Sequence, residues 1–347
     1  MDSFQIAAIL LQDGVTTGAI YALLGMALVL VFAVTRIVFF PQGEMVSYGA
    51  LTLAWLQNGQ VPGTVWLMLA ASLAAGVAEA VAALRERQPG RLAGIVISHA
   101  VLPGLLALVV AWGAPRGWPL LLQCGLSVAV VTLLGPSLYR LVYQPMAQAS
   151  VLVLMIVSVG LHYVLVGLSL IFFGVDGFRT PALWEGRFEI GGLNVTGQSL
   201  VVLAATGLLV LAMALVFGRT LYGKALRAAA SNSVGARLVA ISVPFSGRLS
   251  FGIAAFVGSL CGVLIAPLVT IYYDSGLLIG LKGFVAAIVG GLASYPLTLI
   301  GALGIGVVES FTSFMASAYK ESIVFLLVIP VLWWLSLRGG AHEEEHS

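Results

Sequence analysis

The sequence predicts an all-α protein, a polytopic bundle of membrane helices. Of its 347 residues, 60% are hydrophobic and only 9% are charged, whereas an ordinary soluble domain has about 25% charged residues. The apolar runs are continuous and roughly 20 residues long, the length that an α-helix needs to cross a bilayer. Strands of a membrane β-barrel would instead alternate apolar and polar residues. The composition therefore excludes a soluble enzyme, a disordered chain and a disulfide-rich secreted domain.

The apolar segments predict a single transmembrane domain over residues 1–347, with about 9–11 membrane segments. They are residues 14–35, 43–57, 64–84, 92–112, 118–140, 150–173, 199–217, 249–271, 281–294, 297–316 and 322–337. Because 43–57 and 281–294 are short, we expect half-helices or re-entrant segments there. Residues 4–11 are amphipathic, a pattern typical of a helix that lies in the membrane interface.

The basic residues predict that the N-terminus lies outside and the C-terminus inside. In this orientation eleven of the 16 Lys and Arg residues fall at the inner ends of the segments and five at the outer ends. Cytoplasmic loops carry such an excess of Lys and Arg. Residues 174–198 then form an external loop and residues 218–248 a basic cytoplasmic loop.

The cytoplasmic loop has a helical pattern of its own. Short polar side chains at Ser231–Ser233 favour a helix start, and Val234, Leu238 and Ile241 then recur at helical spacing. We expect a short amphipathic helix outside the membrane that ends before Pro244.

The sequence shows no catalytic constellation. Residues 218–224 have the spacing of a phosphate-binding loop, but Ala225 stands where a hydroxyl would have to reach magnesium. The four histidines are not spaced as metal ligands. A net charge of +2 gives no reason to expect nucleic acid as a partner.

Ionisable side chains inside the apolar segments are the strongest chemical signal. Glu44, His162 and Glu309 lie where a charge costs about 2.5–3.5 kcal/mol, so they should face the bundle or a wet cavity. They are candidates for a translocation path, and hydrogen bonds between helices are the alternative. Glu79 and Lys282 lie near segment ends, where we expect their side chains to reach the membrane interface.

Glycine motifs predict tight packing. The pairs Gly14–Gly18, Gly258–Gly262 and Gly276–Gly280 have GxxxG spacing, which brings helices close together. The run GGLASYP at 290–296 predicts a helix break of the kind found at transport sites.

Together these motifs resemble the permease subunits of branched-chain amino-acid ABC importers, of the LivH type. The matching segments are GVTTGAIYALLGMALVLVFAVTRIVFFPQGEMVSYGA at 14–50, FFGVDGFRTP at 172–181, RTLYGKALRAAASNSVGARLVAISV at 219–243 and LIGLKGFVAAIVGGLASYPLTLIGALGIGVVES at 278–310. The resemblance covers about five-sixths of the chain, and the 219–310 block is the most specific part.

The resemblance implies a multi-pass protein of the bacterial cytoplasmic (inner) membrane that has no catalytic residue and no cofactor of its own. The implied partners are a second homologous permease in a heterodimer, two cytosolic ABC ATPases that bind ATP and Mg, and an extracytoplasmic solute-binding protein. The implied solutes are branched-chain amino acids or related small polar molecules such as urea, amides or carboxylates. The cytoplasmic loop would dock on the ATPases through the positions that match the family: Asn232, Ala236, Arg237, Leu238 and Ile241.

Two departures from the family pattern stand out. The family's His-Gly-Glu is Gln42–Gly43–Glu44 here, which adds Gln42 to the candidate path residues and puts the solute in doubt. Residues 61–116 resemble an inserted helical hairpin, which would leave the topology of the remaining helices unchanged.

Three other classes of function remain open from the residues alone. An ion-coupled secondary transporter or channel would use Glu44, His162 or Glu309 as proton or ion sites. A membrane-embedded enzyme would need a water-accessible cluster of polar groups, and a scaffold would need only the glycine-rich helix contacts.

Overall fold

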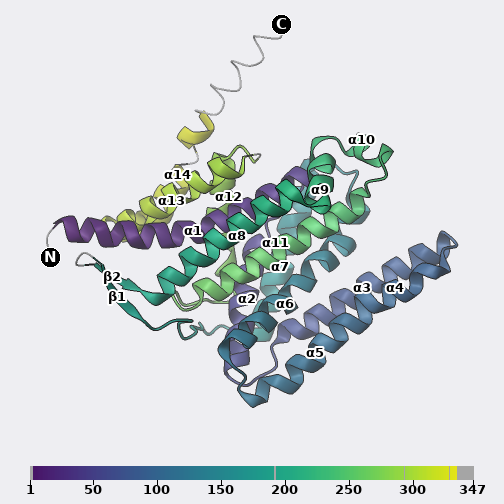
Figure 1. Ribbon diagram of the computed structural model, residues 1–347, viewed down its shortest axis with the longest axis horizontal. Coiled ribbons are helices and arrows are strands. Elements are labelled where there is room, and N and C mark those ends of the chain that lie inside the picture. Colours follow the sequence, from purple (N-terminus) through teal and green to yellow (C-terminus); the bar gives the residue numbers. More distant parts are fainter. Residues whose placement is uncertain (1–2, 191–192, 293, 328, 334–347) are drawn as a thin grey trace, which may run out of the picture.

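The computed structural model describes residues 3–190, 193–292, 294–327 and 329–333. In this part of the chain, eight helical runs are long and apolar enough to cross a membrane. They are α1 (Ser3–Thr35), α3 (Gly63–Arg85), the Pro89–Arg116 run, the Leu120–Met146 run, α7 (Val151–Phe173), α8 (Gly197–Arg219), α11 (Val243–Ile265) and α13 (Tyr295–Met315). Figure 1 shows most of them lying side by side, as predicted for a polytopic helical bundle.

Two of these runs are composite. The first contains α4 (Leu92–Val96) and α5 (Leu102–Gly113), joined by a π-helical turn at Ile97–Val101. The second contains α6 (Leu120–Leu138), followed by a π-helical turn at Tyr139–Tyr143. Each run is nevertheless continuous enough to act as one span.

The first helix is longer than predicted. The amphipathic residues 4–11 belong to α1 and do not form a separate interfacial helix. No proline interrupts residues 3–35, so the helix propagates through both parts. Leu11, half exposed, lies on the outer side of its first turns.

Two short helices meet inside the bundle. They are α2 (Gln42–Gln57) and α12 (Gly276–Val289), the two segments predicted to be short. A Cβ on Gly43 would lie 1.9 Å from the carbonyl oxygen of Gly276 and 3.0 Å from Cα of Gly280. The Gln42 amide donates to the carbonyl of Ala254, in the middle of α11, at 2.9 Å. The N-termini of both half-helices therefore touch near mid-bundle.

The glycine pairs make the close contacts that the sequence predicts. Gly14 and Gly18 of α1 lie against the α13 backbone, and Gly258 and Gly262 of α11 lie against α2. The predicted break near residues 290–296 is also present, because α12 ends at Val289 and α13 begins at Tyr295.

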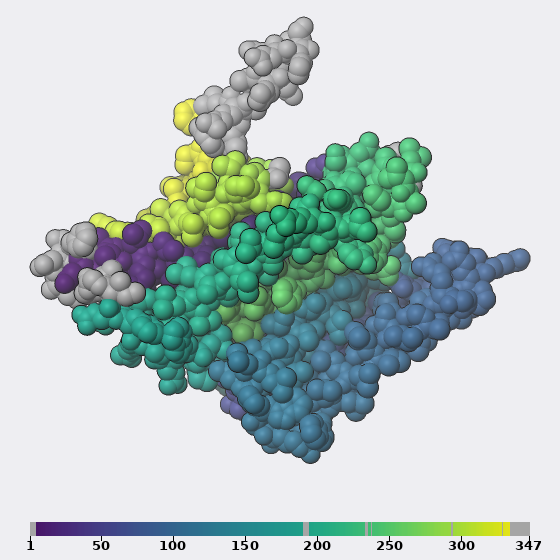
Figure 2. Space-filling model, in the orientation of Figure 1, coloured from purple at the N-terminus to yellow at the C-terminus, as the bar shows by residue number. Residues whose placement is uncertain are grey.

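The segment 61–116 forms a helical hairpin of α3 with α4–α5, which packs on α6 at one edge of the molecule (Figure 1). Only 28% of the apolar window of α3 and 22% of that of the Pro89–Arg116 run is buried, against 83% in α1. On the face shown in Figure 2 the tip of this hairpin stands apart from the segment between α8 and α11. The hairpin is therefore peripheral.

The two ends of the bundle differ. At one end a short antiparallel hairpin, β1 (Arg187–Ile190) with β2 (Leu193–Thr196), precedes α8 within the segment predicted as a loop. At the other end α9 (Leu221–Ser231) and α10 (Ser233–Leu238) connect α8 to α11. We refer to these as the β-hairpin end and the α9–α10 end.

The helix predicted after Ser231–Ser233 is shorter than expected. It ends at Leu238, because Ala240 has a left-handed φ of 62° that no helix continues through. Ile241 therefore lies beyond α10, where its N–H donates to the carbonyl of Ala236 at 2.9 Å. The helix α9 ahead of it was not predicted.

Candidate functional site

A buried acid–imidazole pair lies where the half-helices meet. Nδ1 of His162, halfway along α7, lies 3.0 Å from Oε1 of Glu44, in the first turn of α2. The Glu44 side chain is fully buried and that of His162 is 6% exposed. An isolated charge is costly at such a position, and the pairing offsets much of that cost.

Two helix N-termini face the Glu44 carboxylate. Glu44 occupies the start of α2, and a Cβ on Gly276, the first residue of α12, would lie 2.8 Å from Glu44 Oε1. Helix N-termini carry a partial positive charge that favours a carboxylate. Within the described residues, the buried Glu44 Oε2 and Gln42 Oε1 have no hydrogen-bond partner. The junction thus presents free acceptor atoms inside the bundle.

Glu309 belongs to a different cluster. The Lys282 ammonium of α12 donates to Glu309 Oε1 of α13 at 2.5 Å and to Glu321 Oε1 at 3.2 Å. Glu321 comes from α14 (Lys320–Leu326). The Tyr21 hydroxyl donates to the other oxygen of Glu309 at 2.7 Å. One cation is therefore shared by two carboxylates.

This arrangement overturns the expectation that Lys282 snorkels to the interface. Its side chain is only 7% exposed and its ammonium is bound within the bundle. A sequence signal existed for Glu309, because a carboxylate inside an apolar run must pair with something. The contribution of Tyr21 and Glu321 had no such signal.

The Lys282 cluster lines a cavity of about 650 Å³. Asp13 and Thr17 of α1 and Ser275 at the start of α12 also line it. Its size is that of a small-molecule pocket, typically about 300–1,000 Å³. Residues 265–271 contribute to the wall, and Ile271 pairs with Phe178 of the segment that leads to β1, so the cavity lies toward the β-hairpin end.

The predicted path residues thus form two groups. Gln42, Glu44 and His162 lie together at the half-helix junction, and Glu309 lies in the cavity cluster. The two groups are connected by α12, whose first residue touches Glu44 and whose Lys282 binds Glu309. A shift of α12 would therefore move residues in both groups.

The loop residues assigned to coupling lie at the α9–α10 end. Thr220 caps α9 by accepting from the N–H of Gly223, and Asn232 caps α10 by accepting from the N–H of Gly235 at 2.9 Å. Ala236 is buried, whereas Leu238 is 84% exposed. The side chain of Arg237 lies outside the described part of the chain.

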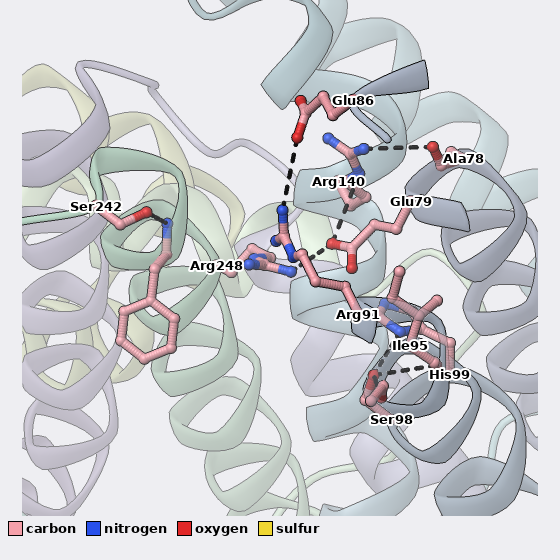
Figure 3. Close-up of polar contacts among 12 residues, drawn as sticks. Ala78, Glu79, Glu86, Arg91, Ile95, Ser98, His99, Arg140, Ser242 and Arg248 are labelled. Atoms are coloured by element: carbon pink, nitrogen blue, oxygen red, sulfur yellow. Dashed lines mark hydrogen bonds and ion pairs between the residues drawn. The ribbon is translucent and has the colours of Figure 1, made fainter. Parts of the chain in front are cut away.

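Glu79 also pairs with side chains of other helices. It accepts from Arg248 of α11, and its Oε1 lies 3.7 Å from Nε of Arg140 (Figure 3). It therefore ties the peripheral hairpin to the bundle. Among the described residues, no three His, Cys, Asp or Glu side chains lie close enough together to hold a metal ion.

Comparison with known proteins identifies the family. Residues 89–332 match the family described as branched-chain amino acid transport system / permease component. Two similar proteins are the high-affinity branched-chain amino acid transport system permease proteins LivH of Escherichia coli, 27% identical over 66% of this chain and 77% of its own length, and of Salmonella typhimurium, 25% identical over 92% and 91%. The protein BraD of Pseudomonas aeruginosa, with the same description, is 23% identical over 93% and 92%. No solved structure matches the chain. The chain therefore belongs to the family of branched-chain amino-acid transport permeases.

Proposed function

We propose that this permease forms, together with a second homologous permease, the membrane path of an ATP-driven importer. The proposed solutes are branched-chain amino acids or related small polar molecules such as urea, amides or carboxylates. The observation that carries the proposal is the junction of α2 and α12, two half-helices of a permease-family chain that meet over buried polar groups. Discontinuous helices of this kind form solute sites in other transporters.

The charges of the cavity suit a zwitterion. A solute ammonium would bind Glu309 or Glu321 in place of Lys282, and the solute carboxylate would bind the Lys282 ammonium so released. The cavity would then be the entry from the external side, and the junction at Glu44 would be the next barrier. A solute-binding protein would deliver the solute at the β-hairpin end, where residues 174–198 lie.

The α9–α10 segment supports ATP-driven coupling. Leu238 at the end of α10 exposes an apolar side chain beyond the spans, where a groove on a cytosolic ATPase could accept it. The segment leads directly into α11, which packs against α1 and α2. Motion of the ATPases would thus reach the junction as a rigid-body shift of α11. ATP and Mg would bind to those partners and not to this chain.

Replacement of Leu238 tests this coupling. In inner-membrane vesicles we expect Leu238→Glu to lower ATP-dependent solute uptake about tenfold or more and to reduce co-purification of the ATPases, because a charge replaces the docking side chain. The control at the same position is Leu238→Met, which keeps an apolar side chain of similar size and should retain both. Unchanged uptake with unchanged assembly in Leu238→Glu would refute the coupling assignment.

The pair of Glu44 and His162 favours a second candidate, an ion-coupled transporter, because ionisable groups inside membranes commonly carry protons. That function predicts uptake that collapses with a protonophore and survives depletion of ATP. The importer predicts the reverse, so one uptake assay in energised vesicles separates the two.

A further inference from the structure

A second charged site lies between the peripheral hairpin and α11, at the α9–α10 end. Figure 3 shows Glu79 of α3, Arg140 of the turn after α6 and Arg248 of α11 converging there. Arg91 approaches from the tip of the hairpin, with its Nη1 3.7 Å from Glu86 Oε2. These five side chains line one cavity of about 300 Å³.

The positive charge of this cavity exceeds what the carboxylates neutralise. Three guanidinium groups face two carboxylates, Glu79 and Glu86. Each guanidinium has five N–H donors in a fork that suits a phosphate or carboxylate. Nε of Arg140 is buried and, among the described residues, has no hydrogen-bond partner. The cavity therefore has both the excess positive charge and an unused guanidinium donor to hold an anion.

An apolar groove lies along the same helices, nearer the middle of their length. It measures about 760 Å³ and is lined almost entirely by apolar side chains. Leu105 and Val109 of α5, Val128 of α6, and Phe256 and Leu260 of α11 form much of its wall. Leu105 is 58% exposed, so the groove opens to the side of the bundle and not to its interior.

The charged cavity and the groove follow one another along the same helices. Arg91 precedes the groove residues on the hairpin, Arg140 follows them on the α6 run, and Arg248 precedes them on α11. At 1.5 Å per residue, the distance from Arg248 to Phe256 along α11 is roughly 12 Å, and Leu260 lies roughly 6 Å further. The half-thickness of a bilayer's hydrocarbon core is about 15 Å. A charged head and an apolar tail of one molecule would span the two sites.

We propose that the charged cavity and the apolar groove together bind one anionic phospholipid. Its phosphate contacts Arg91, Arg140 and Arg248, and one acyl chain lies in the groove between α5, α6 and α11. Basic pockets between membrane helices bind anionic head groups in this way. Charge complementarity and the apolar groove directly beneath the arginines select a lipid, since a water-soluble anion would leave the groove empty and a protein helix would leave the arginines without an anion.

The bound lipid would connect the hairpin to α11, the helix that follows α10. The helical hairpin contacts α11 directly through Glu79 and Arg248 in the charged cavity. The acyl chain of the lipid would fill the groove, which separates the helical hairpin from α11. This role does not depend on which solute the permease moves.

Filling the groove tests the tail site. A Cβ on Gly125 of α6 would meet nothing within 4 Å, and Gly125 lines the groove, so Gly125→Leu starts a new apolar side chain in the groove. Gly167→Leu on α7 is the matched control, because Gly167 is equally open and lies outside the groove. The full chain is purified in mild detergent, exchanged into phosphatidylglycerol or phosphatidylcholine, and examined by native mass spectrometry. We expect one retained phosphatidylglycerol in the wild type and in Gly167→Leu, and a loss of about tenfold or more in Gly125→Leu.

Removing one charge tests the head site. Arg91→Gln should reduce phosphatidylglycerol retention about tenfold, because one charge-assisted contact is lost. Arg87→Gln removes an equal charge from the same exposed loop but outside the cavity, and should retain the lipid. Equal retention of phosphatidylcholine, displacement of the lipid by inorganic phosphate, or a protein subunit that co-purifies in place of lipid and is lost in Gly125→Leu would each overturn the proposal.

Discussion

The core around the half-helices and the peripheral hairpin contain equally apolar spans but are built differently. The apolar windows of α1, α3 and the Pro89–Arg116 run have similar hydropathy. Yet 83% of the α1 window is buried, against 28% and 22% in the two hairpin spans. Hydropathy thus identifies a span but does not tell which face of it meets protein and which meets lipid.

Charged pairs show the same contrast. In the core Lys282 is 7% exposed and binds two carboxylates, whereas Arg91 and Glu86 at the hairpin tip are each 59% exposed. A buried pair that loses one partner leaves an uncompensated charge in a medium of low polarity, and an exposed pair is solvated by water instead. Three predictions sharpen this comparison, in order of decreasing effect on stability.

The largest effect is expected from Lys282→Met. It leaves Glu309 and Glu321 without their shared cation, and we expect a loss of about 3–5 kcal/mol in the free energy of unfolding. Adding Glu309→Gln should restore part of this loss. The matched change in the hairpin is Glu86→Gln, which should cost only about 0–1 kcal/mol. Denaturant unfolding in detergent followed by tryptophan fluorescence measures all three, and equal losses in the core and hairpin variants would contradict the comparison.

A glycine-to-alanine change should have opposite signs in the two regions. Gly43→Ala places a methyl group 1.9 Å from the Gly276 carbonyl oxygen, and we expect it to destabilise the core by about 1–3 kcal/mol. In α5 a Cβ on Gly104 meets nothing within 4 Å, so Gly104→Ala should stabilise the hairpin by about 0.5–1 kcal/mol. Thermal unfolding of the two variants beside the wild type measures the difference. Two shifts of the same sign would mean that the α2–α12 contact is not tight.

The smallest effect on stability, with a large effect on transport, is expected from Glu44→Gln. Glutamine keeps the size of the side chain and its close approach to His162, so the unfolding midpoint should change little. Uptake should fall about tenfold, because the junction loses the charge held between two helix N-termini. Uptake in proteoliposomes containing the whole transporter gives the readout. A shifted midpoint with normal uptake would make Glu44 a packing residue.

Much of the fold follows from local pattern. The long apolar runs predict the spans, and the short runs near residues 43–57 and 281–294 predict half-helices, because span length is set by bilayer thickness. The GxxxG pairs predict close contacts that α1, α11 and α12 do make. Several boundaries differ from the prediction: α1 begins before residue 14, and α10 ends before Ile241. The helix α9 and the β-hairpin were not predicted.

The sequence by itself thus determined the membrane bundle, the half-helices and the family, since these depend on composition, periodicity and motifs. Only the tertiary structure decided which polar groups meet. Glu44 and His162 are 118 positions apart, Tyr21 and Glu309 are 288 apart, and Lys282 is bound where snorkelling was expected. The cost of a charge in the membrane requires a partner, but the choice among many partners depends on helix packing, which no local pattern records.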